Sequence, residues 1–91
     1  MEPLQTLETS ALRAVLELQP TTPAKIAFAF RMVAGAALGR AGTPVWSGDG
    51  TLYVRAPSDA WRQELRRASP ILLGRLTDVL GPGIVRRIDV S

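Results

Sequence analysis

The sequence contains neither cysteine nor histidine, and these two absences exclude several classes of protein. Without cysteine there is no disulfide framework and no thiolate ligand for a metal, and nothing indicates an oxidising compartment. Without histidine the chain lacks the commonest general base, the commonest metal ligand and the side chain that titrates near neutral pH. The eight acidic residues are scattered among basic neighbours. We therefore expect no catalytic residue, no metal site and no cofactor, and a protein that is not an enzyme and works by binding.

The sequence also lacks a long hydrophobic run. The longest apolar stretch, 26–38, is interrupted by Arg31 and is shorter than the roughly 20 residues that cross a bilayer. Glu2 and Pro3 stand where a secretory signal would have positive charge followed by apolar residues. We expect no membrane contact and a cytoplasmic location.

The balance of charge favours a polyanionic partner over a small-molecule substrate. The formal net charge is +3, and ten of the eleven basic residues are arginine, the exception being Lys25. The guanidinium group is planar, binds phosphate through two donors and stacks on bases. GC-rich genomes also favour arginine over lysine, so composition alone leaves both explanations open.

The first half of the chain predicts two helices in a single domain that spans residues 1–91. Apolar residues recur at helical spacing over 4–18, which predicts an N-terminal helix, within residues 1–20, packed on the domain. Thr22 is a suitable N-cap for a second helix over 23–38, which is apolar almost all round and is expected to be central. Gly35 inside this helix predicts the close approach of another backbone.

The middle of the chain predicts a β-hairpin. Asp49 and Gly50 lie between the extended runs 43–47 and 51–56 and are typical of a two-residue type I′ turn. In that register Trp46 pairs with Tyr53. The residues predicted to face the core are Val45, Leu52, Val54 and Ala56. The residues predicted on the opposite face are Trp46, Tyr53 and Arg55.

The last third predicts two helices and a strand. Ser58 begins a helix with Trp61 and Leu65 in the core, a second helix starts at Pro70 with Ser69 as its cap, and 84–90 forms a strand. The order is an N-terminal helix followed by αββααβ. Three strands with helices on one face make a two-layer α+β sandwich whose other face is open.

The open face and the basic helix supply the candidate nucleic-acid contacts. Aromatic side chains beside arginine stack on single-stranded bases, although Trp46 and Tyr53 could instead stabilise the hairpin or meet a protein. The spacing of Arg62 and Arg66 presents their charges along one line, or forms a solvated face balanced by nearby acids. The predicted contact residues are Trp46, Tyr53, Arg55, Arg62, Arg66, Arg67, Arg86 and Arg87.

The ordered set of residues resembles the DciA family of bacterial replicative-helicase loaders, long known as a domain of unknown function. The resemblance rests on FRMVAGAALGRAGTPVWSGDGTLYVRAPSDAWRQELRRASPILLGRL, which begins at Phe30, and on IVRRIDV near the end. Phe30 stands where the family usually has tryptophan. The matching positions are Phe30, Val33, Gly35, Leu38, Pro44, Asp49, Gly50, Leu52, Val54, Ser58, Trp61, Glu64, Leu65, Leu72, Leu73, Leu76, Val85 and Ile88.

The resemblance implies a KH-like domain that binds single-stranded or forked DNA and helps to place the replicative DNA helicase. The Gly-x-x-Gly clamp of ordinary KH domains is missing, because the predicted helix junction reads Arg67, Ala68, Ser69, Pro70. Two other functions remain open: an RNA-binding KH-like module, and a purely protein-binding adaptor that uses the open sheet face.

Overall fold

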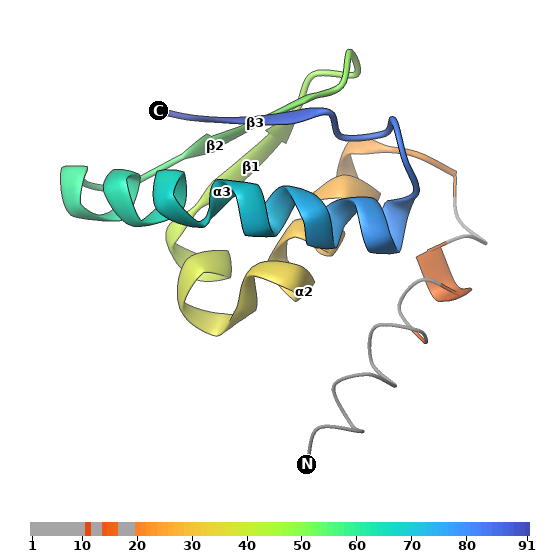
Figure 1. Ribbon diagram of the computed structural model, residues 1–91, viewed down its shortest axis with the longest axis horizontal. Coiled ribbons are helices and arrows are strands. Elements are labelled where there is room, and N and C mark those ends of the chain that lie inside the picture. The colour runs from red at the N-terminus through yellow and green to blue at the C-terminus, as the bar shows by residue number, and fades with distance from the viewer. Residues whose placement is uncertain (1–10, 12–13, 17–19) are drawn as a thin grey trace.

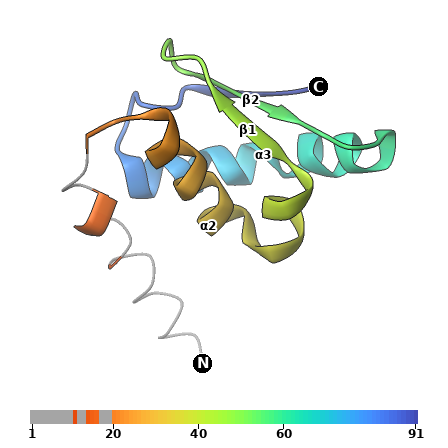
Figure 2. The ribbon, with the colours of Figure 1, turned by 180° about the vertical axis from the view of Figure 1, so that it is seen from behind.

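The chain folds into a two-layer α+β sandwich, as the sequence predicts. The computed structural model describes residues 11, 14–16 and 20–91. Its elements are α2 (Pro23–Ala41), β1 (Thr43–Trp46), β2 (Thr51–Arg55), α3 (Asp59–Leu80) and β3 (Arg87–Val90). The strands lie in the order β1-β2-β3, with β1 antiparallel and β3 parallel to β2. Both helices cover the same side of the sheet, and the other side is open (Figure 1; Figure 2).

The N-terminal helix predicted over 4–18 lies largely outside the described residues. Ala11 and residues 14–16 are helical. The side chain of Leu16 is fully buried and belongs to the hydrophobic core.

Helix α2 starts where the sequence predicts but is broken in its second half. The Thr22 hydroxyl accepts a hydrogen bond from the Lys25 amide at 3.2 Å, and Pro23 occupies the first turn. Gly35 interrupts the helix with φ +87 and ψ 178. The close backbone approach predicted at Gly35 is wrong, because a Cβ there would meet nothing within 4 Å. Glycine stands at this position for its conformation, which other residues rarely adopt.

The hairpin register differs by one residue from the prediction. Trp46 pairs with Leu52 and Val45 pairs with Tyr53. The connection is not a type I′ turn, which needs positive φ at Asp49, because within the described residues only glycines have positive φ. A shift of one residue in one strand moves its side chains to the other face. The placement of Trp46 on the open face is therefore wrong: Trp46 packs against the core, and Val45 is 54% exposed.

Helix α3 is continuous, whereas the sequence predicts two helices. The predicted cap at Ser58 is confirmed, with its hydroxyl accepting from the Trp61 amide at 3.3 Å. Pro70 lies inside the helix on its exposed side, and the Ser69 hydroxyl donates to the Leu65 carbonyl at 2.8 Å instead of capping a new helix. The buried apolar residues Leu65, Leu72 and Leu76 keep helical spacing across Pro70, so a single helix buries them all.

The core lies between the helices and the sheet. Trp61, predicted in the core, is half-buried at the first turn of α3. Ile88 and Val90 face inward from β3, as predicted. The buried apolar side chains are Leu16, Ile26, Ala29, Phe30, Leu52, Val54, Leu65, Leu72, Leu76, Val79, Val85 and Val90.

Candidate nucleic-acid interface

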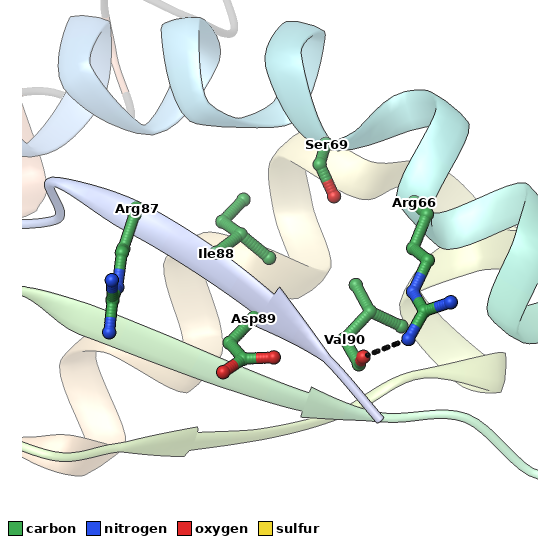
Figure 3. A pocket seen from close by; sticks show the side chains of 6 residues that line it. All are labelled: Arg66, Ser69, Arg87, Ile88, Asp89 and Val90. Carbon is green, nitrogen blue, oxygen red and sulfur yellow. Dashed lines mark hydrogen bonds between the residues drawn. The ribbon is translucent and has the colours of Figure 1, made fainter.

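A groove of about 370 Å³ runs between α3 and β3. Arg66 and Ser69 line it from the helix, and residues 87–90 line it from the strand (Figure 3). The Arg66 Nη2 atom donates to the Val90 carbonyl oxygen at 3.2 Å. This bond spans the groove and fixes one guanidinium at its wall.

Strand β3 is an edge strand, so the groove also offers backbone groups. The amides of Arg87 and Ser91 donate to β2 and the preceding turn, at Gly50 (3.1 Å) and Val54 (3.0 Å). Because alternate residues of a strand direct their backbone groups to opposite sides, Ile88 and Val90 direct theirs toward the groove. The Val90 carbonyl accepts from Arg66, which is consistent with this arrangement. Sequence reasoning missed these groups, because no side-chain pattern reveals which strand forms an edge.

Two further arginines lie where β3 begins. Arg86 Nη2 donates to the Asp49 carbonyl at 3.0 Å, and its guanidinium lies against Gly50, where a Cβ would be 2.5 Å from Nε. Arg87 Nε donates to the Thr51 hydroxyl at 3.1 Å. These acceptors are neutral, and the charge of Arg87 also acts on the carboxylate of Asp49, whose pKa it helps to lower. Arg66 and Arg87 line the groove, and Arg86 lies beside it against the hairpin loop; we name these three residues the β3 arginine cluster.

Arg62 and Arg67 are paired with acids instead. Arg62 Nη1 lies 2.7 Å from the Asp59 carboxylate, and Arg67 Nη1 lies 3.1 Å from that of Glu64. Both pairs are exposed and three residues apart on α3, so each contributes little to stability. Their charges are partly compensated, as the balanced-face alternative predicts, and neither residue lines the groove.

The open face of the sheet carries Tyr53 and Arg55 from β2. Tyr53 is 39% exposed and lies between Val45 on β1 and Asp89 on β3. Arg55 is exposed opposite Thr43, and the part of the chain that the structure describes places no acid in contact with its guanidinium. Of the two predicted stacking residues, only Tyr53 lies on this face, because Trp46 packs on the other side.

Two carboxylates lie near the basic groups. Asp89 lines the groove from β3 and pairs with Tyr53, so its negative charge opposes the approach of an anion to this edge of the sheet. Asp49 lies in the hairpin loop, where the Ser47 hydroxyl and the Thr51 amide donate to it and lower its pKa below the ordinary value. This network orders the loop whose Asp49 carbonyl holds Arg86.

Residues 11, 14–16 and 20–91 show neither a metal site nor a membrane-spanning helix. They contain no group of three or more side chains that could hold a metal ion. They also include no helix of the length and apolarity that spanning a membrane requires.

The fold and the groove define a small α+β domain with a basic groove beside β3, the edge strand that runs parallel to β2. The model of the family described as "Dna[CI] antecedent, DciA" matches residues 5–90, nearly the whole chain. The chain belongs to the DciA family. This membership supports a role in the initiation of DNA replication. No curated protein and no solved structure gives a significant match.

Proposed function

We propose that the protein is a cytoplasmic, non-catalytic adaptor that binds single-stranded or forked DNA and helps to load the replicative DNA helicase. The observation that carries the DNA contact is the β3 arginine cluster: Arg66, Arg86 and Arg87 are all oriented by neutral acceptors at one side of the sheet. Guanidinium groups that donate to neutral acceptors keep more of their charge for phosphate than those paired with carboxylates.

In this proposal the contact residues lie along the β3 edge and the open face of the sheet. Arg55 extends the charge of the cluster onto the open face, and Tyr53 offers a ring on which a base stacks at about 1–3 kcal/mol. Arg62 and Arg67 already have acidic partners and are secondary. Trp46 is not a stacking residue in this proposal, because its side chain packs on the core.

The helix α3 also argues for an interface unlike the KH clamp. Residues 67–70 lie inside α3, so no loop interrupts the helix there to grip a backbone. Phosphate attraction to the β3 arginine cluster takes the place of the clamp. Free backbone groups on the edge of β3 supply hydrogen bonds to bases.

DNA binding is tested by fluorescence anisotropy with a labelled oligothymidylate at several salt concentrations. Four phosphates neutralised by Arg55, Arg66, Arg86 and Arg87 predict a slope of about −3 for log K against log salt, at about 0.7 per phosphate. The double variant R66A/R87A should bind less tightly with a slope of about −1.5. Circular dichroism melting establishes that the variant is folded.

The matched control is R62A/R67A, which removes the same charge from paired residues outside the groove. It should lower DNA affinity much less than R66A/R87A. Equal losses in the two variants, or a flat salt response of the wild type, would show that the groove is not the DNA site. An RNA strand of the same sequence that binds more tightly at the same ionic strength would favour the RNA-binding alternative.

Helicase contact is tested by asking whether the immobilised protein retains the replicative helicase hexamer. We expect retention that survives nuclease treatment, since an adaptor contacts the helicase directly. Loss of the hexamer after nuclease treatment would mean that DNA alone bridges the two proteins.

A further inference from the structure

A second concave surface lies at the break in α2, on the side of the molecule away from the groove. A hollow of about 550 Å³ is lined by residues on both sides of the break, among them Arg31, Met32, Ala36 and Arg40. The packing of α2 on β1 and of α3 on β3 places the hollow and the groove at opposite edges of the sheet. Ligands can therefore occupy both at once.

The backbone at Gly35 creates this hollow. In an uninterrupted helix, residues eight positions apart are separated by about 12 Å along the axis. Here a Cβ on Gly39 would lie 3.0 Å from the Arg31 carbonyl oxygen, so the chain reverses its direction between them. Figure 2 shows α2 changing direction before it meets β1. The reversal leaves an open surface where a straight helix would continue.

Large apolar side chains lie exposed on the same helix. Phe28 is 45% exposed and Met32, which lines the hollow, is 53% exposed. Their spacing of four residues places them on one face, a turn apart. Exposed apolar groups beside a concavity are typical of a site that binds another protein.

Two positive charges flank this apolar surface. Arg31 and Arg40 are exposed and line the hollow. Across the described part of the chain, neither guanidinium has an ion-pair partner. A complementary partner therefore carries carboxylates around an apolar anchor, since like charges or an uncharged polar surface would leave these groups uncompensated.

We propose that this α2 surface, formed by Phe28, Arg31, Met32 and Arg40, docks an acidic amphipathic helix of the replicative helicase. The inference rests on the proposed function and adds the helicase-binding surface to it. A helix laid on the surface places an apolar side chain in the hollow against Met32 and carboxylates against Arg31 and Arg40. The adaptor then holds DNA at one edge of the sheet and the helicase at the other.

The test measures helicase affinity and DNA affinity on the same variants. R31A/R40A should bind the helicase hexamer at least fivefold more weakly in biolayer interferometry and bind oligothymidylate within twofold of the wild type. M32E, which places an acid among the proposed carboxylates, should weaken helicase binding tenfold or more. R62A/R67A is the control of equal charge change and should retain helicase binding.

The outcomes separate the inference from the proposed function. A helicase that binds the wild type, R31A/R40A and M32E equally overturns the α2 surface and leaves the adaptor function standing. A helicase that fails to bind the wild type overturns both. A wild-type dimer in sedimentation that M32E dissociates, with unchanged helicase affinity, assigns the surface to a second copy and overturns the inference.

Discussion

Replacing Gly35 by alanine tests whether the break in α2 depends on a backbone conformation available only to glycine. The torsion angles φ +87 and ψ 178 lie in a region that residues with a side chain rarely occupy. Nothing lies within 4 Å of a Cβ at this position, so steric collision contributes no cost. The expected destabilisation is therefore backbone strain alone, about 1–3 kcal/mol. For a domain of this size each kcal/mol lowers Tm by about 4–8 °C.

Gly74→Ala provides the matched control. Gly74 lies inside α3 with a negative φ, and a Cβ there would also meet nothing within 4 Å. Alanine in a helix interior is about 0.5–1 kcal/mol more favourable than glycine. Thermal and urea unfolding followed by circular dichroism should therefore move in opposite directions for G35A and G74A. A G35A protein as stable as the wild type would show that α2 straightens without cost and would refute the reasoning.

Four further substitutions test the sheet and its loop. Trp46→Ala should lower the free energy of unfolding by about 2 kcal/mol, because most of a large side chain is buried on the core face, whereas Val45→Ala at an exposed position should change it by less than about 0.5 kcal/mol. Equal effects in urea unfolding would contradict the register. Gly42→Ala should cost about 1–3 kcal/mol, since its Cβ would lie 2.6 Å from Val54 Cγ1; an unchanged urea midpoint would refute this close approach. The pKa of Asp49 is lower in the folded protein than its ordinary value, so the ionised carboxylate stabilises the fold fully at neutral pH. This stabilisation is lost as the pH falls below about 4 and then through the pKa of the folded state. Asp49→Asn should remove that part of the acid dependence of Tm, and a pH profile identical to the wild type would contradict the assignment.

Much of the fold follows from local patterns in the sequence. Local patterns predicted that the two helices begin after Thr22 and Ser58. They also predicted the two strands of the hairpin and the final strand, because capping and alternation act over a few residues. The inward positions of β2 and β3 were predictable for the same reason. The continuity of α3 through Pro70 was not, since the signal of a proline competes with an apolar stripe whose burial depends on distant residues.

The candidate site was only partly predictable. The sequence predicts arginines as phosphate ligands, but it does not show that Arg66 meets Val90 across a groove or that Arg62 pairs with Asp59. Adjacency of this kind requires that β3 lie parallel to β2 at the edge of the sheet. The hollow at Gly35 was missed because glycine in a helix predicts close packing as readily as a break.

The sequence by itself determined the α+β class, the helix caps, the excess of arginine and membership of the DciA family. Tertiary structure alone decided which face of β1 points inward, and with it that Trp46 supports the core while Val45 faces solvent. The physical reason is that alternation fixes the spacing of side chains but leaves the choice of face to the loop and to packing on α2. The same non-local packing joins α3 to β3 and brings Arg66 and Arg87 together in one groove.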